Sequence, residues 1–232
     1  MCLISETRLS DCIFATSRPL TGLSVIESFT SFPAALLLIG PTLLLLLAVT
    51  PGGIAERHPR TMGQLIQVVG LVSLTSSLVA ALMTGFAEEA APSTLVVFGS
   101  HIGHFPLALS ARADSLSFTL MTLISLLAAI IARYSTSYLA GEATQGSFFR
   151  WLAFTVSAFM LVVIAGNMLM FVLAIGLTGS GLNRLLTHYR DRLPAQMVAH
   201  KKLLFSRMAD ASLLVAAVLI AVSEGTSSFE TL

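Results

Sequence analysis

The sequence has few charged residues, and this scarcity decides its class. Only 11% of its 232 residues are Asp, Glu, Lys or Arg, whereas a soluble domain carries roughly 25%. So few polar groups could not coat a globule of this size, which excludes a soluble domain. The formal net charge is +1, so the chain lacks the basic excess of a nucleic-acid-binding protein. With 55% hydrophobic residues, the composition indicates a polytopic membrane protein surrounded by lipid.

Recognisable metal and cofactor motifs are also missing. The only cysteines, Cys2 and Cys12, lie in the polar N-terminal stretch without the spacing of metal ligands. His101 and His104 are two histidines without a third ligand, which makes a poor zinc site. The sequence contains no phosphate-binding glycine loop, catalytic triad, flavin motif or iron–sulfur motif. We therefore expect no catalytic residue, no metal and no cofactor in this chain, which predicts a membrane subunit that is not itself an enzyme.

The sequence contains several long apolar runs. A membrane-spanning helix needs about 20 mostly apolar residues, and six runs qualify. The fourth and fifth form one stretch, Phe148–Leu186, which we expect to break at Gly166 and Asn167 because these residues favour a reversal. The other expected helices cover Phe32–Thr50, Met62–Phe86, Leu116–Tyr138 and Leu203–Val222.

Two short segments between the second and third helices read as strands instead. Residues 93–99 (STLVVFG) and 105–110 (FPLALS) predict a small hairpin on the membrane surface, and Asp114 after it is expected to anchor the third helix. The predicted fold class is an all-α membrane protein with about six transmembrane helices and a small β-hairpin between the second and third. We divide the chain into a polar N-terminal segment (1–31), a transmembrane domain (32–222) and a tail (223–232).

Lysine and arginine placement predicts the orientation. The segment from Arg184 to Lys202 carries five basic residues, which mark it as cytoplasmic: Arg184, Arg190, Arg192, Lys201 and Lys202. Counting helices backwards from there places the N-terminus on the periplasmic or exoplasmic side. We expect a multi-pass protein of the cell inner (plasma) membrane.

The last expected helix carries charge inside its apolar run, in "HKKLLFSRMADASLLVAAVLIAV". If it enters the hydrocarbon near Leu203, Asp210 lies about 10 Å deep, at roughly 1.5 Å per residue. An aspartate at the membrane centre costs roughly 2.5–3.5 kcal/mol on insertion scales. Arg207 is three residues earlier and shares a face with Asp210. Two interpretations stay open, a structural ion pair and a water-lined path that moves protons or another ion.

A cluster of small residues precedes this helix. Gly176, Gly179 and Gly181 alternate with hydroxyl side chains in the fifth expected helix. Small residues let helix backbones approach closely, so we expect these glycines to serve helix packing. The alternative is a loosened backbone beside a solvated cavity.

From Asp114 onward the chain resembles the antiporter-like membrane subunits shared by respiratory complex I and Mrp antiporters. "HKKLLFSRMAD" is similar to their Lys-x-Phe-x-x-x-Arg-x-Gly-Asp motif, with Lys201, Arg207 and Asp210 at the matching positions. In "AGNMLMFVLAIGLTGSGL", Gly176 replaces the glutamate of their Gly-Trp-Glu motif, a member of the family's proton channel. The following residues, 182–210, resemble the DabB subunits of DAB inorganic-carbon transporters instead.

The resemblance implies a function that composition does not show. It implies an energy-coupled bicarbonate or CO2 pump, in which this chain supplies a cation path, with the proton as the expected cation. The implied partner is a DabA-type subunit that holds zinc and resembles a β-carbonic anhydrase. Family members have a dozen or more helices, so we expect an incomplete transmembrane domain, the first half.

Two alternatives remain beside this function. One is a proton-translocating, non-redox antiporter-like subunit of an NADH–quinone oxidoreductase or of an Mrp-type antiporter. The other is a structural membrane scaffold.

Overall fold

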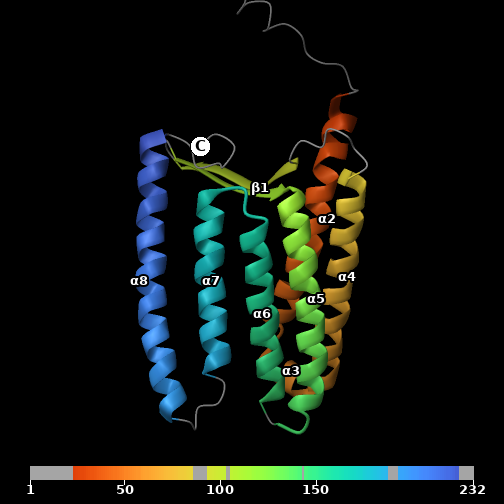
Figure 1. The fold of residues 1–232 in the computed structure, drawn as a ribbon, viewed down its shortest axis with the longest axis vertical. Helices are drawn as coiled ribbons and strands as arrows, with labels where there is room; N and C mark the ends of the chain where they lie inside the picture. The colour runs from red at the N-terminus through yellow and green to blue at the C-terminus, as the bar shows by residue number, and fades with distance from the viewer. Residues whose placement is uncertain (1–22, 86–92, 103–104, 143, 188–192, 225–232) are drawn as a thin grey trace, which may run out of the picture.

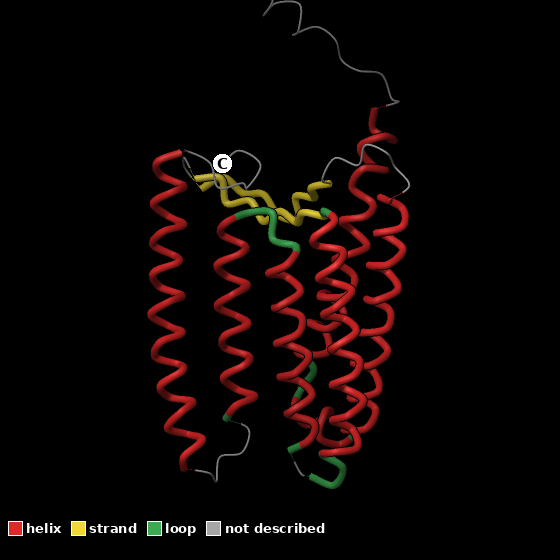
Figure 2. Tube along the Cα trace, viewed as in Figure 1, coloured by secondary structure: helices red, strands yellow, loops and turns green. Residues whose placement is uncertain are grey.

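The computed structural model describes residues 23–85, 93–102, 105–142, 144–187 and 193–224. Its helices stand side by side, and a two-stranded hairpin crosses one end of the bundle (Figures 1 and 2). The elements, in chain order, are α2 (Leu23–Val49), α3 (Gly52–Arg57), α4 (Pro59–Gly85), β1 (Ser93–Ile102), β2 (Phe105–Ala113), α5 (Ser115–Tyr138), α6 (Gln145–Val163), α7 (Met168–Leu186) and α8 (Leu193–Glu224).

Within the described ranges, five helical segments are long and apolar enough to cross a membrane. They are Pro59–Met83, Ser115–Tyr138, Gln145–Val163, Met168–Leu186 and His200–Ser223. The shorter apolar segment Ala35–Val49 lies within α2. These segments coincide with the six expected spans, and the hairpin lies between the second and third of them. The expected fold class, a helical membrane protein with one hairpin, is confirmed.

The first and last membrane helices begin earlier than their apolar runs. α2 starts at Leu23 rather than Phe32, because no glycine or proline interrupts the residues before Phe32. α8 starts at Leu193 rather than Leu203. Pro194 lies in its first turn, where proline is tolerated because the missing N–H has no intrahelical partner. Hydropathy marks the lipid-facing part of a helix and misses the polar turns that precede it.

α2, α4, α5 and α6 form the packed core of the bundle. The side chains of Leu44, Ile66, Met121 and Phe149 are all buried within it. Polar groups also join these helices, since Ser157 on α6 donates a 2.7 Å hydrogen bond to the carbonyl of Pro41 on α2. The core therefore holds the first four spans together, and α7 extends it through α6.

The long apolar stretch breaks at Gly166 and Asn167, as predicted. The side chain of Asn167 caps α7 by accepting a hydrogen bond from the N–H of Leu169 at 3.0 Å. The N–H of Gly166 donates to the carbonyl of Ser110 on β2 at 2.7 Å. A Cβ on Gly166 would lie 2.9 Å from the hydroxyl oxygen of Ser110. The turn thus needs glycine because a strand of the hairpin passes directly against it.

The predicted hairpin is present and longer than expected. β1 and β2 pair antiparallel from Ser93 opposite Ala113 to Ile102 opposite Phe105, with an irregularity near Val96. Both strands lie across the end of the bundle opposite the start of α8 (Figure 1). Because β2 bonds to the turn between α6 and α7, and both strands also contact α2, the hairpin links helices that are far apart in sequence.

Candidate functional site

Arg207 and Asp210 of the last helix lie at the contact between α7 and α8. These two helices run antiparallel at the edge of the bundle (Figure 1). In the described part of the chain α8 packs chiefly against α7. Its remaining faces expose apolar side chains, such as Leu204, Phe205 and Leu219. The single packed face of α8 is therefore where its polar residues can meet partners.

Arg207 and Asp210 form an ion pair on this packed face. The Nη1 of Arg207 lies 3.5 Å from the Oδ2 of Asp210. The Asp210 side chain is only 18% exposed, whereas that of Arg207 is 54% exposed. The Nη2 of Arg207 donates a 2.9 Å hydrogen bond to the hydroxyl of Ser180 on α7. Arg207 thus bridges the two helices and neutralises a carboxylate that is turned inward.

Asp210 lies over a glycine of α7. A Cβ built on Gly176 would be 4.0 Å from the Oδ2 of Asp210, and this oxygen accepts no hydrogen bond from any described residue. A lone carboxylate inside a membrane helix is costly, and neighbouring charge or water lowers that cost. Arg207 supplies the charge, and the missing side chain at Gly176 leaves space beside the carboxylate.

The three glycines of α7 face two different helices. A Cβ on Gly179 would lie 3.0 Å from the Oγ of Ser206 on α8. A Cβ on Gly181 would collide instead with Thr155 on α6. Since each residue turns about 100° around a helix with 3.6 residues per turn, residues two apart point in nearly opposite directions. Gly176 and Gly179 therefore serve the contact with α8, and Gly181 serves the contact with α6.

The two lysines at the start of the last membrane span also point in different directions. Lys201 is exposed. Lys202 is half-buried and lines a small cavity with Asn183 and Ser206. The family motif indicates Lys201 by its position and gives no indication of Lys202, Asn183 or Ser180. The spacing of residues 202, 206 and 210 was the available signal, since it places all three on one helical face.

These residues form one continuous strip, which we call the polar seam. It runs along the α7–α8 contact and consists of Gly176, Gly179, Ser180 and Asn183 on α7 with Lys202, Ser206, Arg207 and Asp210 on α8. It carries two cationic side chains and one carboxylate. The arrangement can hold water and charge within an otherwise apolar pair of helices.

A second charged group lies at the other end of the bundle. Asp114 caps α5, and its Oδ1 accepts hydrogen bonds from the N–H and hydroxyl of Ser117 at 2.8 and 2.7 Å. The Nε of Arg112 lies 3.6 Å from its Oδ2. Burial disfavours the charged form, but these hydrogen bonds and Arg112 outweigh it and lower the pKa of Asp114. Asp114 therefore caps and anchors the start of the third span, as expected.

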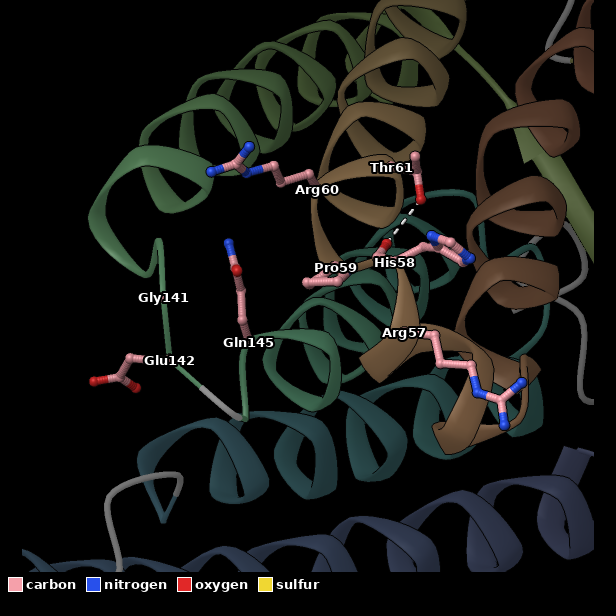
Figure 3. A pocket seen from close by; sticks show the side chains of 8 residues that line it. All are labelled: Arg57, His58, Pro59, Arg60, Thr61, Gly141, Glu142 and Gln145. Atoms are coloured by element: carbon pink, nitrogen blue, oxygen red, sulfur yellow. Dashed lines mark hydrogen bonds between the residues drawn. The ribbon is translucent and has the colours of Figure 1, made fainter.

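An open pocket of about 380 Å³ lies at the end of the bundle opposite the hairpin, where α4 begins. Figure 3 shows that the side chains of Arg57, Arg60 and Glu142 around it point away from one another. No group of three or more His, Cys, Asp or Glu side chains gathers anywhere in the described ranges. This pocket does not bring together the ligands that a metal or a small anion would need.

Comparison with known proteins shows which membrane subunits this chain resembles. Residues 100–149 match a family model described as the N-terminus of chain 5 of NADH-ubiquinone oxidoreductase (complex I). A probable inorganic carbon transporter subunit of Halothiobacillus neapolitanus, DabB2, is 41% identical over 87% of this chain and 36% of its own length. The probable subunit DabB of Hydrogenovibrio crunogenus is 32% identical over 49% of this chain and 22% of its own length.

A more distant relative comes from the quinone oxidoreductases. NAD(P)H-quinone oxidoreductase subunit 5, organellar chromatophore 1, of Paulinella chromatophora is 26% identical over 72% of this chain and 24% of its own length. The chain spans at most 36% of the length of these relatives. The chain is thus similar to probable inorganic carbon transporter subunits over most of its length and, in residues 100–149, to the N-terminus of complex I chain 5, and its apolar helices fit a multi-pass membrane protein.

Proposed function

We propose that this chain supplies part of a cation path in an energy-coupled transporter for bicarbonate or CO2, with the proton as the cation. In this proposal the path follows the polar seam. Asp210 takes up and releases the proton, Arg207 is its counter-ion, and Lys201 lies at the membrane surface where the path begins. A DabA-type subunit carries the zinc and the carbon chemistry.

The ion pair inside a candidate membrane span is the observation that carries the proposal. Asp210 is turned toward α7 within the span His200–Ser223, where an ionised group is expensive and marks function by default. Its Oδ2 is buried and, although it faces Arg207, accepts no hydrogen bond from the described residues, so it keeps a lone pair that a proton could occupy. A purely structural pair would be expected to saturate both carboxylate oxygens.

The names of the relatives supply the substrate class. Two of them are named as probable inorganic carbon transporter subunits, and a subunit by definition acts with others. Since the chain spans 36% of the length of DabB2, a complete path across the membrane belongs to the longer protein in this proposal.

The test replaces Asp210 in the full-length protein together with its partner. We expect Asp210→Asn to abolish bicarbonate uptake and growth at air-level CO2 while the complex still assembles, because the amide keeps the shape and loses the titratable proton. Ser212→Ala on the exposed side of α8 is the matched control and should transport normally, since its hydroxyl donates to the carbonyl of Ala209 in its own helix.

One outcome would contradict the proposal. If Asp210→Asn transports like the natural protein while Asp210→Leu only weakens assembly, the pair is a structural scaffold. Co-purification provides an independent check, since a large zinc-containing subunit should accompany the chain.

A second function is favoured by the match at residues 100–149 and by the quinone oxidoreductase relative. In this case the chain would be a non-redox, proton-translocating subunit of an NADH–quinone oxidoreductase. Gly176, in place of the family's glutamate, argues against it. NADH-driven proton pumping that is lost in Asp210→Asn, without any effect on bicarbonate uptake, would favour this second function.

A further inference from the structure

Two buried polar atoms between α7 and α8 have no hydrogen-bond partner among the described residues. They are the Nζ of Lys202 and the Oδ1 of Asn183. Both residues line the same cavity, together with Ser180, Ser206 and Arg207. A lysine ammonium only donates, and an amide oxygen only accepts. The two groups are therefore complementary, yet no hydrogen bond joins them.

The cavity between them has the size of one small molecule. Its volume is about 10 Å³, close to the space that a single water needs. A buried water is favoured where a cavity offers two to four polar partners, and this cavity offers an ammonium, an amide oxygen and the hydroxyls of Ser180 and Ser206. Bicarbonate or any larger ligand would not fit.

We propose that one water molecule occupies this cavity, accepts a hydrogen bond from the Nζ of Lys202 and donates one to the Oδ1 of Asn183. The water satisfies both buried groups without moving either helix. It also makes Lys202 the cationic end of the polar seam, whereas Lys201 is exposed. Lys202 is thus a positioning residue that holds water where the seam reaches the basic end of α8.

The position of Lys202 links this water to the ion pair. Lys202, Ser206 and Asp210 follow one another at four-residue intervals on the face of α8 that meets α7. At roughly 1.5 Å per residue, Lys202 lies about 12 Å from Asp210 along the helix. Ser206 and the Ser180–Arg207 hydrogen bond fill the interval. Any role of Lys202, Asn183 and their water in transport rests on the proposed function. The water site itself does not.

The first experiment measures the site itself. In an experimental structure of the full-length protein that shows ordered water, we expect a density peak within hydrogen-bonding distance of the Lys202 and Asn183 side chains. A direct bond between them, an empty cavity, or a Lys202 side chain turned into solvent would overturn the proposal.

A second measurement compares the two neighbouring lysines in the same protein. In lipid nanodiscs, we expect an amine-acylating reagent to label Lys202 at least about tenfold more slowly than Lys201, because Lys202 must first leave the seam. Asn183→Leu removes the acceptor and should abolish this protection, whereas Ser212→Ala should keep it. Equal labelling of both lysines in the natural protein, or unchanged protection in Asn183→Leu, would contradict the water site.

Transport assays separate this inference from the proposed function. Lys202→Met and Asn183→Leu should lower bicarbonate uptake several-fold, and less than Asp210→Asn does. If Asp210→Asn leaves uptake intact while the water density and the lysine protection are present, the proposed function fails and the water site stands. If the density and protection are missing while Asp210→Asn abolishes uptake, the water site fails and the proposed function stands.

Discussion

Asp114 shows how one carboxylate makes the stability of a membrane helix depend on pH. Its pKa in the folded chain lies below the ordinary value of 3.8. As the pH falls, the unfolded chain therefore binds this proton before the folded chain does. The stabilisation by Asp114 is complete above the ordinary pKa and is lost as the pH falls through the lower folded value. At neutral pH the cap is fully ionised and fully effective.

Replacing Asp114 should show how much this cap contributes to the free energy of unfolding. We expect Asp114→Ala to lower the free energy of unfolding at neutral pH by about 1 kcal/mol, the usual cost of losing an N-cap. Asp114→Asn should cost less, because an amide oxygen can still accept from Ser117, and its difference from the natural protein should shrink in acid. Thermal unfolding in detergent at several pH values measures this. An Asp114→Ala protein as stable as the natural one would refute the capping role.

At the scale of whole elements, the hairpin holds the turn at which α7 begins. On β2, the carbonyl of Ser110 accepts a hydrogen bond from the N–H of Gly166. The N–H of Arg112 donates to the carbonyl of Ile164 at 2.8 Å. These bonds hold the turn from which α7 departs. The direction of α7, and with it the polar seam, is thus set partly by a strand on the membrane surface.

A side chain on Gly166 should disturb this connection. We expect Gly166→Val to destabilise the chain by about 1–3 kcal/mol, the usual cost of overpacking, because its Cβ alone would lie 2.9 Å from the hydroxyl of Ser110. Gly53→Val is the matched control, since a Cβ at Gly53 has no neighbour within 4 Å among the described residues. Thermal unfolding compares the two variants. Equal stability in both would mean that the strand does not hold the turn.

At the scale of the molecule, the bundle has a basic end and a hairpin end. The starts of α4 and α8 lie at the basic end, with Arg57 and Arg60 near the former, and the hairpin lies at the other (Figures 1 and 3). The rule that cytoplasmic segments are enriched in lysine and arginine predicts that the basic end faces the cytoplasm. α5 connects the two ends, so residues beside its termini report on the orientation.

Cysteine labelling tests this orientation. In a Cys2→Ser, Cys12→Ser background of the full-length protein, we expect Ser115→Cys at the hairpin end to react with a membrane-impermeant thiol reagent in intact cells. Glu142→Cys at the basic end should react only after the cells are opened. Both native side chains are exposed, so accessibility does not limit either reaction. Reversed labelling would invert the predicted topology.

The sequence by itself determined the properties that are local or additive. Hydropathy summed over each run gave the number of spans, Gly166 and Asn167 gave the break, and three-residue spacing placed Arg207 and Asp210 on one face. Each of these needs only a few neighbouring residues, because helical geometry and the cost of burying charge act over short stretches of chain.

Only the tertiary structure decided which groups meet across helices. α8 is apolar around most of its circumference, and the row of Lys202, Ser206 and Asp210 in its sequence does not by itself indicate which neighbouring helix it faces. Packing turned Lys202 rather than Lys201 toward α7 and paired Arg207 with Ser180. It also directed Gly181 to α6 while Gly179 faces α8. These outcomes depend on the rotation of one helix against another, which is fixed by contacts between residues far apart in the chain.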